Sequence, residues 1–85
     1  MATVLITAEA RSEFNALPRP IQARVASVFE RLKNWPDVSG AKPLRGDLVG
    51  SWRIRTGDYR VVFRPSASDQ TVILWKIGYR GNVYD

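Results

Sequence analysis

One segment constrains the fold of this chain more than any other, residues 51–64, which read S-W-R-I-R-T-G-D-Y-R-V-V-F-R. A run that alternates apolar and basic residues precedes Gly57-Asp58, and a run of aromatic and β-branched residues follows it. This pattern predicts a β-hairpin. Because glycine adopts positive φ without steric cost, we place a two-residue type II′ turn at Gly57-Asp58. The turn then sets the register of both strands.

That register predicts which side chains share a face of the hairpin. Thr56 faces Tyr59, and Trp52, four residues further from the turn, faces Phe63. Because side chains alternate along a strand, one face is apolar and the other is basic. The apolar face carries Trp52, Ile54, Tyr59, Val61 and Phe63, and the basic face carries Arg53, Arg55, Arg60 and Arg64. We expect the apolar face to be the core side.

The basic face is unfavourable for stability by itself. Arg55 lies directly opposite Arg60 in this register, and like charges at opposed positions destabilise a sheet. An anionic partner would explain the arrangement. The alternative is a solvated face on which arginine stems cover apolar neighbours. The hairpin alone leaves both interpretations open.

Composition excludes several kinds of chemistry. The chain has no cysteine and no histidine, which removes disulfides, thiolate nucleophiles, the commonest metal ligand and the usual general base. The acidic residues are scattered, so we expect neither a metal nor a cofactor. The net charge is +5, and residues 42–85 hold eight basic but only four acidic residues. This excess favours a phosphate-rich partner or an acidic protein segment.

The length of 85 residues predicts one domain over residues 1–85. No apolar run approaches the length of a membrane span, and no basic-then-apolar leader is present. We therefore expect a cytoplasmic protein without a membrane partner.

The first half of the chain predicts a strand and two helices. A short strand is expected over residues 2–6, and Thr7 suits the N-cap of a helix over residues 8–16. The apolar stripe of a second helix covers residues 21–35, and Pro36 stops it. Two helices joined by a few residues form a hairpin that can cover one face of a sheet.

The segments around the hairpin complete the predicted fold. Proline and glycines make residues 37–50 a loop, which places Lys42 and Arg45 beside the hairpin as ligands or as solvated charges. Residues 71–79 are apolar on both sides up to Lys76 and predict a central strand. The predicted class is α+β, with an N-terminal strand and a two-helix hairpin packed on a mainly antiparallel four-stranded sheet, in the order βααβββ.

Alternation along the last strand predicts where its side chains point. Trp75 and Ile77 are expected under the helices, beside Trp52 and Phe63 of the hairpin. On the other side, Lys76 and Arg80 are expected to join the basic face of the hairpin. The basic surface would then continue from the hairpin onto the last strand.

The order of elements and four short motifs together resemble the RelE/ParE superfamily of bacterial toxins. The motifs are L-R-G at 44–46, R-I-R at 53–55, G-D-Y-R at 57–60 and G-Y-R-G-N-V-Y at 78–84, and the resemblance spans essentially the whole chain. RelE-like members are ribosome-dependent endonucleases that cut mRNA, and an antitoxin usually encoded beside the toxin neutralises them. ParE-like members instead poison DNA gyrase.

The resemblance implies roles for individual residues. Arg53 and Arg55 fall where the family has its basic pair on the second strand, Arg60 falls on its motif arginine, and Arg80 and Tyr84 fall on its C-terminal basic residue and tyrosine. These five are the candidate catalytic residues. The candidate RNA-binding residues are Lys42, Arg45, Arg64 and Lys76. The implied chemistry is attack of an RNA 2′-hydroxyl on the adjacent phosphate without a metal, with arginines stabilising the charge of the transition state.

The chain departs from the family pattern at two points. Arginine practically cannot lose its proton, so with Arg53 and Arg55 in place of lysines the general base is unidentified. Lys76, Tyr79 and Tyr84 are the candidates, and Tyr79 could equally be a core or interface aromatic. Many relatives end in G-H-R-R-D-V-Y, where this chain has G-Y-R-G-N-V-Y, and have a C-terminal helix, which we do not expect here. These departures are compatible with a weaker nuclease or a decayed toxin.

The leading hypothesis from the sequence is a RelE-like toxin that cleaves mRNA on the ribosome. Two alternatives remain, a ParE-like gyrase inhibitor and a non-catalytic RNA-binding module. For any such toxin, an exposed cationic groove predicts an antitoxin segment that is acidic or amphipathic and folds as it binds, in a toxin–antitoxin hetero-oligomer.

Overall fold

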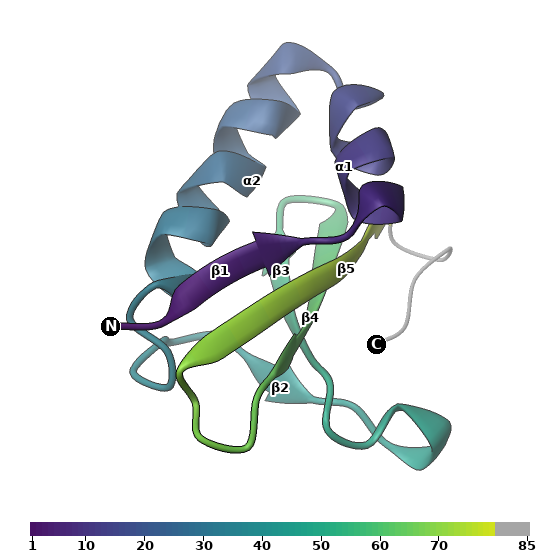
Figure 1. Ribbon diagram of the computed structural model, residues 1–85. Helices are drawn as coiled ribbons and strands as arrows, with labels where there is room; N and C mark the ends of the chain where they lie inside the picture. Colours follow the sequence, from purple (N-terminus) through teal and green to yellow (C-terminus); the bar gives the residue numbers. More distant parts are fainter. Residues whose placement is uncertain (80–85) are drawn as a thin grey trace.

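The computed structural model describes residues 1–79 as two α-helices on one side of a five-stranded mixed sheet (Figure 1). In chain order the elements are β1 (Thr3–Ile6), α1 (Ala8–Asn15), α2 (Arg19–Leu32), β2 (Lys42–Pro43), the 3₁₀ turn η1 (Gly46–Leu48), β3 (Trp52–Thr56), β4 (Tyr59–Pro65) and β5 (Thr71–Tyr79). The strand order is β1-β5-β4-β3-β2, with β1 parallel to β5 and the other pairs antiparallel. The predicted α+β class is confirmed, and β5 lies inside the sheet as its apolar sequence predicts.

The sheet has one strand more than the four predicted. Lys42 and Pro43, which the sequence placed in a loop, pair antiparallel with Arg53 and Trp52 and form the edge strand β2. Proline suits this position because an edge strand does not need hydrogen-bond donors on both sides. A strand of two residues is too short to leave a periodic pattern, so sequence reasoning missed it.

The β3–β4 hairpin has the register predicted from its turn. Thr56 pairs with Tyr59, and Trp52 pairs with Phe63. Gly57 has a φ of 62°, the left-handed value required at the first central position of a type II′ turn. A Cβ atom at this position would also lie 2.9 Å from Nη1 of Arg24 in α2. The turn therefore requires glycine, whereas the contact with the flexible end of the Arg24 side chain could be relieved by a shift of that side chain.

The helices begin where the sequence predicts, but the second ends earlier. Oγ1 of the N-cap residue Thr7 accepts a hydrogen bond from the backbone N–H of Ala10 at 3.1 Å. α2 ends at Leu32 rather than at Trp35, because the following N–H groups bond to carbonyls three residues earlier and tighten the chain. Trp35 is still buried. No helix within residues 1–79 is both long and apolar enough to cross a membrane.

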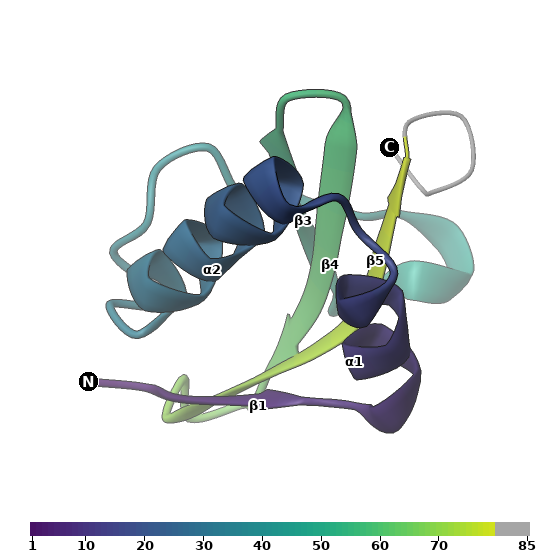
Figure 2. The same cartoon turned by 90° about the horizontal axis from the view of Figure 1, so that it is seen from above.

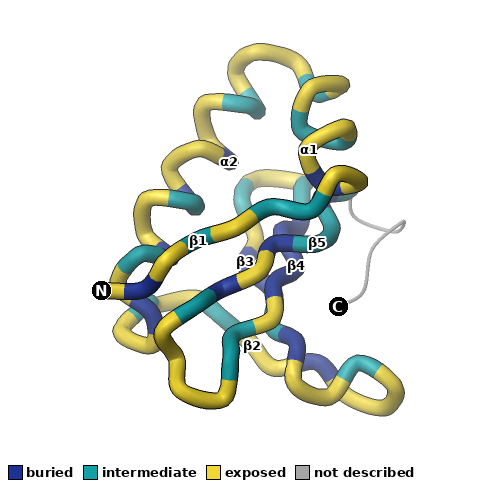
Figure 3. The backbone as a smooth tube through the Cα atoms, viewed as in Figure 1, coloured by how far each residue is buried: buried dark blue, intermediate teal, exposed yellow. Residues whose placement is uncertain are grey.

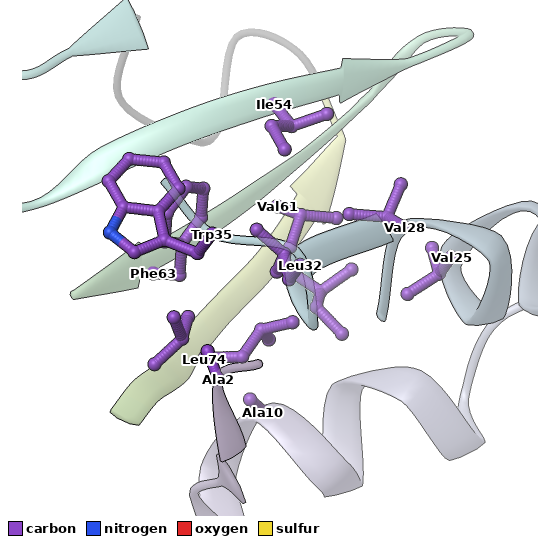
Figure 4. Close-up of a cluster of buried hydrophobic side chains, with 12 residues drawn as sticks. Ala2, Ala10, Val25, Val28, Leu32, Trp35, Ile54, Val61, Phe63 and Leu74 are labelled. Atoms are coloured by element: carbon purple, nitrogen blue, oxygen red, sulfur yellow. The ribbon is translucent and has the colours of Figure 1, made fainter. Parts of the chain in front are cut away.

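The core lies between the helices and the side of the sheet that faces them (Figures 2 and 4). Buried apolar residues from α1, α2 and the inner strands form one cluster, which includes Ala10, Val25, Val28, Leu32, Ile54, Val61, Phe63, Leu74 and Ile77. Phe63 is fully buried, and Trp35 packs edge-on against it with ring centroids 5.1 Å apart. The outer surfaces of both helices are mostly exposed (Figure 3). Apolar burial in this layer is the main force that joins helices and sheet.

A β-bulge in β5 changes which of its side chains face the helices. Val62 pairs with Lys76, but the next residue of β4, Phe63, pairs with Leu74, so Trp75 is an extra residue on β5. Leu74 therefore lies in the buried cluster, and Trp75 does not. Strict alternation instead predicted Trp75 under the helices. That prediction is wrong because the bulge shifts the alternation by one residue.

Candidate functional site

The side of the sheet that faces away from α1 and α2, called the open face below, carries most of the predicted site. Residues opposed on neighbouring antiparallel strands point to the same side, so the register defines rows across this face. One row consists of Lys42, Arg53, Val62 and Lys76, and the next row consists of Arg55, Arg60 and Gly78. The fold thus brings basic residues from four strands onto one face, of which the hairpin pattern predicted those on β3 and β4.

Two of the predicted catalytic arginines are buried in the open face. Arg53 is 8% exposed and Arg60 is 5% exposed, whereas Arg55, which pairs with Arg60, is exposed. The expected exposed cationic groove therefore does not include Arg53 and Arg60, which are buried, although Arg55 and Arg64 are exposed. Both lie on inner strands of the sheet, β3 and β4, where neighbouring strands lie on either side. A guanidinium held in this way attracts an anion more strongly than one in bulk water, because the local dielectric constant is lower.

Exposed cations surround this buried pair. Lys42 on β2, Arg55 on β3 and Arg64 on β4 are exposed. Arg45 is also exposed, but it immediately precedes η1 and belongs to no strand, so the sheet register does not place it in a row. The open face therefore has a buried pair of arginines in its interior and exposed basic residues towards its margins.

Lys76 is engaged by a residue that sequence reasoning missed. Its Nζ lies 2.6 Å from Oε2 of Glu13 in α1, and Oε1 of Glu13 accepts the backbone N–H of Ile77 at 3.0 Å. β1 pairs with β5 only as far as Leu74, and α1 lies beside the remaining part of β5 (Figure 1). Glu13 therefore supplies the acceptor that β1 no longer provides. No sequence signal links the two segments, since their approach depends on the docking of α1.

Trp75 lies on the opposite side of the sheet from the one that the sequence predicted. Its indole Nε1 donates a hydrogen bond to Oγ of Ser51 at 3.2 Å. Ser51 directly precedes Trp52, which packs on the core, so alternation puts Ser51 on the open face. The indole of Trp75 therefore also lies on the open face, where it adds an aromatic group to the cations.

Tyr79 lies on the opposite side of the sheet from the arginines. It pairs with Tyr59, and their rings meet edge-to-face with centroids 5.4 Å apart. Alternation from the row of Arg60 and Gly78 places both tyrosines on the side of the helices. The interpretation of Tyr79 as a packing aromatic is thus favoured over a catalytic role. Two further candidates, Arg80 and Tyr84, lie outside the described residues.

The arrangement suits the binding of phosphate groups without a metal. Arginine donates two parallel hydrogen bonds to phosphate oxygens, and a rigid sheet keeps such donors in place before the ligand arrives. Within residues 1–79, no three acidic, histidine or cysteine side chains gather in a way that could hold a metal ion. The fixed arginines can provide electrostatic stabilisation of negative charge.

Comparisons with known proteins agree on one family. Residues 4–84 match the family model for the ParE toxin of the type II toxin–antitoxin system parDE. The chain is 35% identical to the toxin RelG of Mycobacterium tuberculosis over 83 residues, which cover 96% of this chain and 94% of that protein. It is 42% identical to the toxin RelE of the same organism over 82 residues, which cover 95% of this chain and 84% of that protein.

A solved structure has the same fold. The structure of the toxin–antitoxin complex RelBE2 from Mycobacterium tuberculosis contains a chain that superposes with a TM-score of 0.80 at 30% sequence identity. The match covers 93% of this chain and 98% of that chain. The arrangement of helices and sheet described above is therefore that of a chain in a known toxin–antitoxin complex.

Proposed function

The chain belongs to the RelE/ParE family of type II toxin–antitoxin toxins, and from this premise we propose that it is a ribosome-dependent mRNA endonuclease that blocks translation. In the proposed reaction the 2′-oxygen of one nucleotide attacks the adjacent phosphorus, and the bond from phosphorus to the 5′-oxygen breaks. The 2′-hydroxyl gives its proton to a base, and the leaving 5′-oxygen takes one up. The products are a 2′,3′-cyclic phosphate and a free 5′-hydroxyl.

One observation carries this proposal, the burial of Arg53 and Arg60 on adjacent strands with Arg55 opposite Arg60. Burying guanidinium groups costs desolvation free energy, and opposing two of them adds repulsion. A bound phosphate accepts hydrogen bonds from guanidinium groups and so offsets part of this cost, and its charge grows as the pentavalent intermediate forms. Groups that are fixed before the reaction stabilise this charge without reorganisation.

The proposed roles follow from chemistry and position. Arg60, with Arg80 as implied by the family resemblance, stabilises charge on the phosphate oxygens. Tyr84 stacks on a base or moves a proton. For the general base, Tyr79 lies on the wrong side of the sheet and Lys76 is engaged by Glu13, which leaves Tyr84 as the candidate that we carry forward.

The proposed partner is a cognate antitoxin that covers the open face in a toxin–antitoxin complex. The similar RelBE2 chain was solved as a toxin–antitoxin complex, which supports such a partner here. Exposed Lys42, Arg55 and Arg64 favour an acidic or amphipathic segment, because opposite charges speed association and select the partner.

The experiment that tests the function is primer extension on mRNA in a translation extract, with a matched naked-RNA reaction. Cuts at decoding-site positions only when ribosomes are present support the endonuclease. Arg60→Ala is expected to abolish the cuts. Arg19→Ala, an exposed arginine on α2, is the matched control and should cut like the wild type.

The alternative function is inhibition of DNA gyrase, since the family model that matches is described as a ParE toxin. A folded protein that leaves mRNA intact but blocks supercoiling would establish this function and refute the nuclease. Failure of both activities, with retained RNA binding, would indicate a non-catalytic RNA-binding module.

A further inference from the structure

The bulge in β5 places one aromatic residue among the cations of the open face. Val62 pairs with Lys76 and Phe63 pairs with Leu74, so Trp75 is an extra residue on β5. Without the bulge, Trp75 would alternate with Lys76 and face the helices. The bulge instead turns its indole to the open face, where the side chain is half-buried. A large aromatic on this face has no role in the core that the helices cover.

The indole of Trp75 is held in one orientation across the sheet. Its Nε1 reaches Oγ of Ser51 at 3.2 Å, and β4 lies between β5 and the start of β3. The side chain therefore crosses β4, and it lies along the sheet rather than upright. Val62 of β4 points to the same face by register and is fully buried, as expected under such a cover. The Trp75 side chain is half-buried, so part of its surface is accessible on the open face.

Arg64 approaches the same short segment from β4. Its guanidinium lies so close to Gly50 that a Cβ there would be 3.0 Å from Nη2. Gly50 has a φ of 99°, which favours glycine, and it precedes Ser51 in the chain. The Arg64 guanidinium thus lies beside Gly50, and the Trp75 indole is bonded to the next residue, Ser51. A base on an aromatic ring beside an arginine that binds its phosphate is how proteins hold single-stranded nucleic acid.

We propose that Trp75 and Arg64 form a subsite for one nucleotide of a single-stranded RNA, with the base stacked on the indole and its phosphate at the guanidinium. Ser51 acts as a positioning residue that fixes the ring. The subsite rests on the proposed function, because it assigns a place on the open face to a nucleotide next to the one that is cut. Stacking tolerates any base, so the subsite contributes affinity and alignment rather than sequence selection.

Fluorine NMR of the full chain labelled with 5-fluorotryptophan tests contact directly. The chain has three tryptophans, and Trp75→Phe identifies the Trp75 signal, while Trp35 and Trp52 report on the core. The probe is a single-stranded 2′-O-methyl RNA hexamer, which cannot undergo 2′-hydroxyl attack. We expect the Trp75 signal alone to shift, and inorganic phosphate not to reproduce the shift. An unmoved Trp75 signal at millimolar RNA would overturn the subsite.

Affinity measurements on variants test the energetic part. Trp75→Ala is expected to weaken binding of the hexamer by about 5-fold to 150-fold, the range for loss of one stacked base. Arg64→Ala should lower the slope of log affinity against log salt by about 0.7, as for one lost phosphate contact on a single strand. Arg19→Ala on the helix side is the control and should leave both quantities unchanged. A Trp75→Ala variant that binds like the wild type, with the Trp35 and Trp52 signals intact, would refute stacking.

The two proposals can fail separately. If the Trp75 signal responds to RNA but no ribosome-dependent cuts appear, the subsite holds and the nuclease proposal fails. If the wild type cuts mRNA and Trp75→Ala cuts with an unchanged rate, the nuclease proposal holds and the subsite is wrong.

Discussion

Removal of the Glu13 carboxylate tests how α1 is joined to the end of β5. Glu13 accepts the N–H of Ile77 at 3.0 Å and pairs with Nζ of Lys76 at 2.6 Å, where β5 has no further partner from β1. We expect Glu13→Ala to destabilise the protein more than Glu13→Gln. The amide oxygen of glutamine still accepts from Ile77, whereas alanine leaves that N–H without its acceptor.

The expected magnitude follows from the two contacts. A hydrogen bond to a charged group contributes about 1.5–3 kcal/mol, and the lower end applies because the Glu13 side chain is 27% exposed. The ion pair contributes only about 0.5 kcal/mol, because the Lys76 side chain is 36% exposed and water screens it. The sum is about 2 kcal/mol for Glu13→Ala and below about 1 kcal/mol for Glu13→Gln. In a domain of this size the former corresponds to a fall in Tm of roughly 8–16 °C.

Urea and thermal unfolding followed by circular dichroism would measure these changes in the wild type and in four variants. The variants are Glu13→Ala, Glu13→Gln, Lys76→Met and the double variant Glu13→Gln/Lys76→Met. The double-mutant cycle isolates the ion pair, for which we expect a coupling free energy of about 0.5 kcal/mol.

Two results would contradict this account. If Glu13→Ala and Glu13→Gln cost the same free energy, the contact with the Ile77 N–H contributes nothing. If both variants are as stable as the wild type, α1 is held to β5 by its apolar contacts alone.

Three further predictions concern the core, the turn and the face. Phe63→Ala removes a fully buried ring that packs on Trp35 and should cost about 3–5 kcal/mol, measured as a lower urea midpoint; a loss below about 1 kcal/mol would contradict the core described here. Gly57→Ala should lower the free energy of unfolding by about 1–2 kcal/mol because of the positive φ. Adding Arg24→Ala removes the contact with the new Cβ but not the backbone strain, so a Tm restored to the wild-type value would contradict the strain argument. Arg55→Ala should reduce the salt slope of RNA binding by about 0.7 with little effect on the unfolding free energy, and an unchanged slope would remove Arg55 from the RNA-binding face.

The hairpin shows how far local chemistry can predict this fold. Gly57 sets the turn, the turn sets the register, and the register alone puts Arg53, Arg55 and Arg60 on one face. These steps involve residues close in sequence, for which alternation and turn geometry are sufficient. The cap of α1 and the apolar stripe of α2 were predictable for the same reason.

The features that were missed all depend on contacts between distant segments. β2 exists because Lys42 and Pro43 find an edge of β3, and two residues carry no pattern of their own. The bulge at Trp75 arises from the pairing of β4 with β5, and alternation cannot anticipate an inserted residue. Both errors changed the predicted surroundings of the site rather than its principal arginines.

The sequence by itself determined the fold class, the hairpin register and the gathering of arginines on one face, because each follows from local periodicity and from the turn at Gly57. Only the tertiary structure decided that Arg53 and Arg60 are buried, that Glu13 holds the end of β5, and that Trp75 joins the open face. Burial and cross-strand contact depend on which segments pack together, and that packing is a property of the whole chain rather than of any local pattern.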